Sequence, residues 1–367
     1  MNDSTKQPAP SSSPPSPWDR RLALARKLMP WSSLALGLAS ALLMDRSPER
    51  AGFIAAAAVL GWALLIALAQ VHRAKDEHLP QRHRLALRTA RFGSLFASQY
   101  AIQLSLFFAL PFYARATPWH PAHLLFLAGL SAAALLTLWD PWFTRLLARP
   151  GTALAMQACA SFAALNVVLP VLGASNRVSL WVSAALTAVA IPATVAAMAQ
   201  GERRRRALSA ALAAALVPGV LALGGTRLVP PAPLRLVKAS LGTVRAGYDV
   251  ADPAQALASV PPQLVCATAV WAPRGLHDAL FHVWAKDGAA TDRIALTVEG
   301  GAVSGFHTWS VKKHLSPGTW SCRVETASGQ LLGERDVVLG NAAPPPLPAP
   351  PTPASTESTP STPSTTD

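Results

Sequence analysis

Long apolar runs alternate with short charged breaks between about residues 28 and 226. The runs come close to the roughly 20 residues that an α-helix needs to cross the hydrocarbon layer of a bilayer. A helix also satisfies its own backbone hydrogen bonds in lipid, so we predict helices rather than strands here. The seven predicted spans are 28–44, 51–70, 92–112, 119–139, 151–172, 178–199 and 207–225.

A second pattern follows, in which short runs rich in β-branched and aromatic residues alternate with turn signals such as "KDG", "EGG" and "SPG". Strands of this length and spacing are typical of an all-β sandwich. The predicted strands are 264–271, 279–286, 292–299, 304–311, 318–326 and 331–339, with an earlier strand within 235–245.

The two patterns divide the chain into five segments. Residues 1–27 form a polar, basic tail and residues 341–367 a Pro/Ser/Thr-rich tail, and both compositions are typical of disorder. The helical membrane domain covers 28–226 and the β domain covers 235–340. A Pro-rich linker, 227–234, joins them.

Composition and charge predict where the chain is located and how it is oriented in the membrane. Only 14% of the residues are charged, against about 25% in a soluble domain. Lys and Arg gather in the N-terminal tail and in every second loop after it, ending in the run "RRRR" at 203–206. The positive-inside rule places these segments in the cytoplasm and residues 227–367 outside, in the periplasm of a bacterium with an inner membrane. The net charge of +13 is therefore a topology signal, and no nucleic-acid partner is expected.

An alternative for the first span stays open. "LASALLM" carries a weak signal-peptidase motif at Ala39 and Ala41, and cleavage there would leave six spans with the same sidedness. The apolar run continues to Met44, which favours an uncleaved helix.

The first candidate site is a face of His, Trp and Lys side chains on two predicted strands. In "FHVWAK", alternation separates the apolar Phe281 and Val283 from the side chains on the other face. An exposed Trp can stack on a sugar ring, while Lys and His donate hydrogen bonds to phosphate or carboxylate. The predicted ligand face comprises His282, Trp284, Lys286, His307, Trp309 and Lys312.

We expect this face to bind an envelope ligand: a cell-wall glycan, a wall fragment or an anionic lipid head group. The alternative is that both Trp side chains pack against the membrane domain or inside a two-faced sheet.

Three cysteines give the second candidate. Cys159 lies in a predicted span as a small packing residue. Cys266 and Cys322 lie in predicted strands outside the membrane, where an oxidising compartment allows a disulfide between them; two separate buried thiols are the alternative. Together with Trp284 they follow the Cys…Trp…Cys order of immunoglobulin domains, but alternation puts Trp284 on the wrong face for that comparison.

The predicted spans contain few groups that could do chemistry. The acidic Asp45 and Asp140 fall at span ends. We expect four uncharged polar residues to make hydrogen bonds between helices: Gln99, Gln103, Gln157 and Asn166. No P-loop, nucleophile elbow or HExxH motif is present, so we predict no catalytic residue, no cofactor and no metal site.

The motifs "HVW", "GFHTWS" and "PGTW…V…SGQLLG" resemble the C-terminal domain of a family of bacterial membrane proteins. That family joins several N-terminal spans to a small β domain, both of unknown function. The resemblance covers about residues 263–340. It implies a fold layout and an envelope location, but no activity and no catalytic residue.

Taken together, the sequence predicts seven membrane helices that carry an immunoglobulin-like β-sandwich, acting as a non-enzymatic binding or sensing module. Its expected partners are the lipid bilayer, a wall glycan or anionic lipid, and a membrane protein. One alternative is an enzyme acting on lipid-linked envelope substrates, for which Asp140, Gln99 and Gln103 would have to share a cavity. The other is a scaffold that binds protein partners through the sandwich, with Trp284 in the interface.

Overall fold

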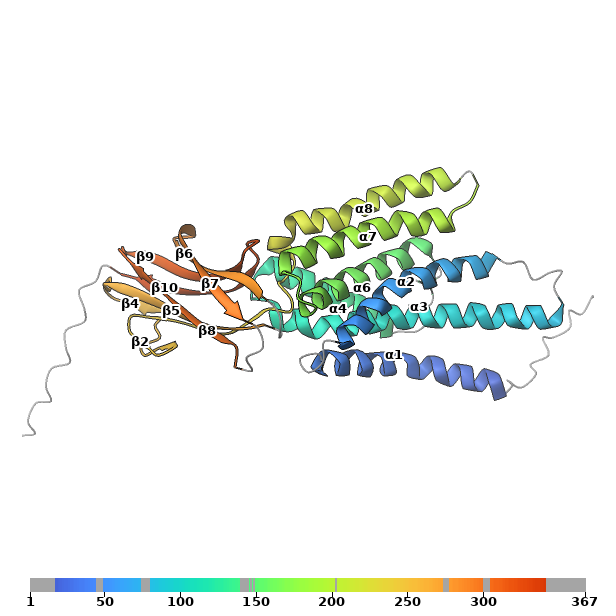
Figure 1. Cartoon of the computed structure of the whole chain (residues 1–367), viewed down its shortest axis with the longest axis horizontal. Coiled ribbons are helices and arrows are strands. Elements are labelled where there is room, and N and C mark those ends of the chain that lie inside the picture. Colours follow the sequence, from blue (N-terminus) through green and yellow to red (C-terminus); the bar gives the residue numbers. More distant parts are fainter. Residues whose placement is uncertain are drawn as a thin grey trace, which may run out of the picture.

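A computed structural model of the chain describes residues 17–43, 49–73, 80–138, 145, 147, 149–201, 203–272, 277–299 and 304–340. Its helices and strands form two units placed end to end (Figure 1). Asp45, Asp140, the C-terminal tail 341–367 and the first part of the N-terminal tail lie outside the described residues.

The described residues form seven helices. They are α1 (Pro17–Leu43), α2 (Glu49–Arg73), α3 (Gln81–Ala116), α4 (Pro121–Leu138), α6 (Pro150–Val171), α7 (Asn176–Met198) and α8 (Arg203–Leu228). Five of them, α2, α4, α6, α7 and α8, are long and apolar enough to cross a membrane. Each predicted span overlaps one helix. These apolar helices indicate a multi-pass membrane protein.

Polar side chains tie neighbouring helices together. Gln103 of α3 accepts a hydrogen bond from Ser33 of α1 at 2.9 Å and donates one to the Thr137 carbonyl of α4 at 2.7 Å. Gln157 of α6 donates to the Ala58 carbonyl of α2 at 3.0 Å. For these two glutamines, the predicted role between helices is confirmed.

Small residues let the same helices approach closely. A Cβ atom on Gly37 of α1 would lie 2.8 Å from the Phe107 Cβ of α3. On Gly61 of α2 it would lie 2.3 Å from the Gln157 Nε2 of α6. Asn166 also makes a predicted interhelical bond, because its amide donates to the Tyr113 hydroxyl of α3 at 3.0 Å.

The strands follow in the second unit. They are β1 (Arg235–Gly242), β2 (Arg245–Ala246), β3 (Asp249–Val250), β4 (Ala256–Leu257), β5 (Gln263–Trp271), β6 (His277–Lys286), β7 (Ala289–Glu299), β8 (Phe306–Lys313), β9 (Gly318–Thr326) and β10 (Leu331–Leu339). All the predicted strands are present, with ends shifted by a few residues at most. The sequence pattern does not predict the two-residue strands β2, β3 and β4.

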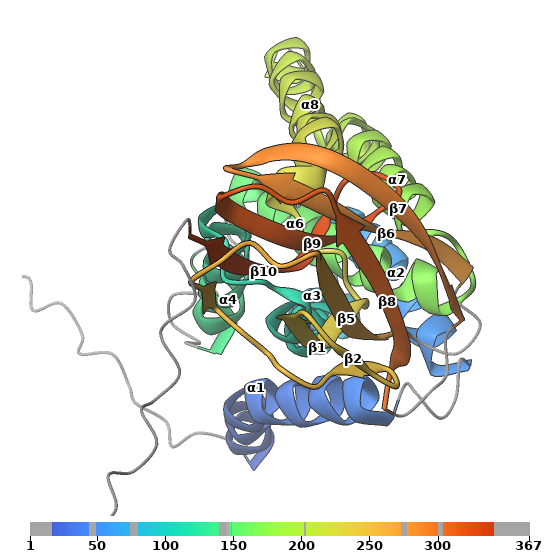
Figure 2. The same cartoon turned by 90° about the vertical axis from the view of Figure 1, so that its left-hand side faces the viewer.

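Two main sheets make up the β domain (Figure 2). One has the strand order β1-β5-β8 and the other β4-β10-β9-β6-β7, while β2 and β3 form a separate hairpin. Apolar residues from both main sheets share one core, in which Leu241 and Leu264 of the first sheet meet Trp320 and Val337 of the second. A disulfide between Cys266 of β5 and Cys322 of β9 also links the two sheets.

Alternation of side chains gives the core side of β7 and β9, but the predicted orientation is wrong for β6. Ile294 and Leu296 of β7 and Val324 of β9 pack in the core, as alternation predicts. In β6, however, Leu280 and Trp284 belong to the core instead of Phe281 and Val283.

The reason lies on the outer face of β6. The Arg293 guanidinium lies 4.0 Å from the centre of the Phe281 ring and covers it. Val283 and Ala285 are buried as well. Because apolar residues fill both faces of this inner strand, alternation does not distinguish the core side from the outer side.

The β domain contacts the helical unit through the turn between β9 and β10. The Gln330 side-chain amide donates to the Val229 carbonyl, just after α8, at 3.0 Å, and its oxygen accepts a hydrogen bond from Asn176 at the start of α7. Gln330, Asn176 and Val229 are all fully buried. The two units therefore meet at a closed junction beside the linker.

Candidate functional site

The structure separates the predicted ligand face into two groups. His282 and Trp284 are fully buried between the sheets, whereas His307 is exposed and Trp309 is 38% exposed. The prediction of one shared surface is therefore wrong. The two His-x-Trp motifs lie on β6 and β8, which belong to different sheets. The side chains of His282 and Trp284 face the inner side of the β1-β5-β8 sheet, whereas those of His307 and Trp309 lie on its outer side.

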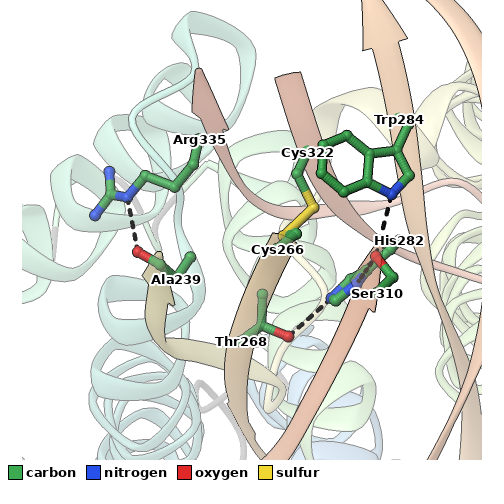
Figure 3. Close-up of a disulfide and its surroundings, with 8 residues drawn as sticks. All are labelled: Ala239, Cys266, Thr268, His282, Trp284, Ser310, Cys322 and Arg335. Carbon is green, nitrogen blue, oxygen red and sulfur yellow. Dashed lines mark hydrogen bonds between the residues drawn. A yellow bond between two sulfur atoms is a disulfide. The ribbon is translucent and has the colours of Figure 1, made fainter. Parts of the chain in front are cut away.

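His282 and Trp284 belong to a polar network inside the core (Figure 3). The two ring nitrogens of His282 lie 2.8 Å from the Thr268 hydroxyl of β5 and 2.8 Å from the Ser310 hydroxyl of β8. The Trp284 indole N–H donates to the same Ser310 hydroxyl at 3.1 Å. The network thus joins β6 to β5 and β8 of the opposite sheet.

Burial lowers the pKa of His282 to about 4. Its ring is therefore neutral at pH 7, so one nitrogen donates and the other accepts. A neutral His with both nitrogens bonded is a structural group of the core rather than a free acid or base.

The disulfide lies beside this network. Trp284 stands opposite Cys322 in the β6–β9 register, so the indole packs in the core next to the bridge (Figure 3). Possible metal-ligand atoms of Cys266, His282 and Cys322 all lie within 4.8 Å of one another. The two sulfurs are bonded to each other, which leaves this group without a thiolate for a metal ion.

The exposed group gains two residues that the sequence pattern does not reveal. We name Arg245, Tyr248, His307 and Trp309 the aromatic-basic patch. The Arg245 guanidinium lies 3.9 Å from the centre of the Trp309 ring, and the Tyr248 and His307 rings are 6.1 Å apart. Both new members come from the β2–β3 hairpin.

Several contacts hold this hairpin against the outer face of the β1-β5-β8 sheet. Val250 packs on Val265 and Ala267 of β5. The Asp252 carboxylate accepts hydrogen bonds from the backbone amides of Thr243 and Val244, the latter at 2.8 Å. These contacts position Arg245 and Tyr248, so the patch rests on fixed backbone.

The remaining two lysines of the predicted face do not join the patch. Lys312 forms an ion pair with Asp292, and its amine lies 5.4 Å from the centre of the Trp320 ring. Lys286 lies at the end of β6, where a Cβ on Gly318 would approach its side chain. Both lysines are partly buried.

The helical unit contains a large crevice of about 1230 Å³. Its lining comes from α2, α4, α6, α7 and α8, with Leu147 between α4 and α6, and consists almost entirely of apolar side chains. Neither Gln99 nor Gln103 is part of this lining, and Asp140 lies outside the described residues. This crevice is therefore not the polar cavity around Gln99 and Gln103 that an enzyme of the membrane domain would need.

Two family models match the chain. The model described as "Family of unknown function (DUF5924)" matches residues 18–272. The model described as "Protein of unknown function (DUF2914)" matches residues 277–337. No curated protein matches the chain.

The boundary between the two matches falls inside the β domain. Strands β1 and β5 lie in the first match, but β5 pairs with β8 of the second, and the disulfide joins β5 to β9 across the boundary. The two matched regions therefore share one folded unit. Since the first match covers more than half of the sequence, the chain belongs to the family of unknown function DUF5924.

Proposed function

We propose that this chain is a bacterial inner-membrane protein that presents an immunoglobulin-like β-sandwich in the periplasm and binds an anionic envelope glycan there, without catalysis. In this proposal all seven helices cross the membrane. The aromatic-basic patch is the binding surface.

The charge distribution supports this orientation. The exposed Arg204, Arg205 and Arg206 lie at the start of α8, at the end of the helical unit farthest from the β domain (Figure 1). The same rule that places Lys and Arg in the cytoplasm then places the β domain on the other side of the membrane. A disulfide is also typical of an oxidising compartment.

The strand arrangement supports the immunoglobulin-like assignment. A disulfide between the sheets, with a buried Trp packed beside it, is a hallmark of that fold. Here the bridge joins β5 to β9, and Trp284 comes from β6, next to β9. The parallel pairing of β4 with β10 also ties the first half of the domain to its last strand.

The observation that carries the ligand proposal is the stack of Arg245 on Trp309 beside the Tyr248–His307 pair. Tyr248 is 65% exposed. Aromatic faces suit the apolar faces of sugar rings, and the guanidinium suits a carboxylate or phosphate on the same ligand. An anionic glycan offers both groups together.

The test uses the full chain in lipid nanodiscs, incubated with purified cell-wall sacculi, soluble envelope glycans and anionic lipid vesicles. We expect retention by sacculi or a glycan, and a loss of roughly tenfold in affinity for Trp309→Ala and Arg245→Ala. Arg293→Ala is the matched control, because it removes an Arg stacked on an aromatic ring of the other sheet.

Equal retention of wild type and both patch variants would refute the patch as the binding surface. Binding to vesicles alone would identify a lipid head group as the ligand. Loss of a co-purifying protein, without any glycan effect, would instead favour the scaffold function.

A further inference from the structure

The crevice in the helical unit is open to its surroundings as well as large. Ligand pockets commonly measure about 300–1,000 Å³, and this crevice reaches about 1230 Å³. Two of its lining residues, Leu125 of α4 and Val217 of α8, are 71% and 57% exposed. Figure 2 shows α8 projecting at the edge of the helical unit. An apolar molecule in the bilayer can therefore reach the crevice from the side.

The crevice is somewhat longer than one leaflet of the membrane is thick. On α6 the lining extends from Pro150 to Ala163, which at 1.5 Å per residue is about 20 Å. One leaflet accounts for about half of a hydrocarbon layer of roughly 30 Å. The crevice thus begins at the end of α6 and passes the middle of the membrane, which is enough for an extended fatty acyl chain.

The polarity of the lining also suits an acyl chain. Thr187 brings the one hydroxyl group among the lining residues that the structure describes, and it already donates to the Ser183 carbonyl at 2.8 Å. Because this hydroxyl already has a hydrogen-bond partner, it does not need a polar group of a ligand in the crevice.

Positive charge gathers at one end of the crevice. Arg149 directly precedes Pro150 and Gly151, and Arg206 directly precedes Ala207, all three of which line the crevice. Arg149, Arg204, Arg205 and Arg206 are exposed. The helices α6 and α8 both begin at this end, so their positive dipole ends add to the same field.

We propose that the crevice binds a phospholipid with an anionic head group. One acyl chain lies along α6 between α4 and α8. The phosphate lies at the arginine end, near Arg149 and Arg204–206, where each Arg near a membrane surface favours an anionic lipid. This inference concerns the membrane unit and does not depend on the glycan proposal for the β domain.

The test is native mass spectrometry of the full chain released from detergent, with phosphatidylglycerol and phosphatidylcholine of identical acyl chains as probes. We expect wild type to retain phosphatidylglycerol at least roughly fivefold better. A triple variant, Arg204→Gln/Arg205→Gln/Arg206→Gln, should lose this preference while keeping residual binding of both lipids. Arg177→Gln is the charge control, because Arg177 lies in the first turn of α7, next to the contact of Asn176 with the β domain.

The acyl-chain part of the proposal has its own variants. Gly129 lines the crevice, and a Cβ atom added to it would meet no other atom within 4 Å, so Gly129→Leu should fill the space and reduce binding of both lipids. Ala214→Leu should do the same from α8, on the opposite wall. Gly52→Leu is the control, because Gly52 has equally open space but lies outside the crevice lining.

Three results would overturn the proposal. Equal retention of both lipids by wild type would refute the anionic selectivity. Unchanged lipid binding in both Gly129→Leu and Ala214→Leu, with melting temperatures like that of wild type, would refute the crevice as the binding site. A dimer signal that Ala214→Leu abolishes, without any bound lipid, would instead identify a second copy of the chain as the occupant.

Discussion

The two units of this protein both hydrogen-bond their buried polar side chains, but they differ in how tightly the surrounding apolar residues pack. In the β domain, His282 and Trp284 share hydrogen bonds inside a core that a disulfide also links across the sheets. In the helical unit, Gln103 and Gln157 bond to neighbouring helices, while a large apolar crevice remains open on the other side of α6. Water drives the first core to close, because apolar burial is favourable there. Lipid provides no such force between helices, so close packing and hydrogen bonds hold the second unit together.

Loss of the disulfide is the strongest way to test this contrast. We expect Cys266→Ala/Cys322→Ala to lower the free energy of unfolding of the β domain by about 4 kcal/mol, given the sequence separation of 56 residues. Hydrogen exchange should rise in β6 and β9 and stay unchanged in α2 and α6. Equal destabilisation of both units would show that their stabilities are coupled, contrary to this comparison.

The buried His282 makes the stability of the β domain depend on pH. Its pKa of about 4 in the folded state lies below its ordinary value of 6.5, so the unfolded chain takes up the proton first as the pH falls. The stabilisation is complete above about pH 6.5 and is lost toward pH 4, with a slope of up to about 1.4 kcal/mol per pH unit.

Denaturant unfolding of the β domain at several pH values measures this slope. His282→Gln should flatten it over that pH range, and His307→Gln, on the exposed patch, should not. If both variants keep the slope of wild type, His282 does not titrate as the structure implies.

The sequence predicts the elements of both units better than it predicts their interiors. Apolar periodicity over long windows locates the helices, and turn signals locate the strands. The sequence pattern gives the wrong orientation for β6, because the outer face of that strand is also apolar. The Arg293 side chain covers this outer face. The stack of Arg245 on Trp309 forms because the short β2–β3 hairpin folds onto β8, which is distant in the sequence. No local sequence pattern encodes this contact.

The crevice is hidden from the sequence for a related reason. Ala158 and Ala214 line it, whereas Ala160 and Ala164 of α6 are buried in packed contacts. A run of small apolar residues looks the same in both settings. Helix tilt and neighbouring helices decide between contact and open space, and these are set by the whole assembly.

Close packing in the helical unit predicts a smaller effect than the disulfide. Gly61→Ala would bring a methyl group within 2.3 Å of the Gln157 amide, which bonds to α2. We expect a loss of about 1–3 kcal/mol in stability, seen as a lower melting temperature in detergent. Gly52→Ala on the same helix has open space and should leave the melting temperature unchanged or raise it. Equal effects of the two changes would point to helix propensity instead of packing.

The junction between the units should give the smallest effect, because it joins two bodies that are each held together internally. Gln330→Ala removes the bonds from the β9–β10 turn to Asn176 and Val229, at a cost of about 1 kcal/mol. Hydrogen exchange should rise at the start of α7 and in residues 229–234, with both cores unchanged. Ser328→Ala is the control, because the Ser328 hydroxyl bonds to Thr326 and Gln330 within the same turn. Exchange that also rises throughout β6 would mean that contact with the helices stabilises the β domain, and the comparison between two independently held units would fail.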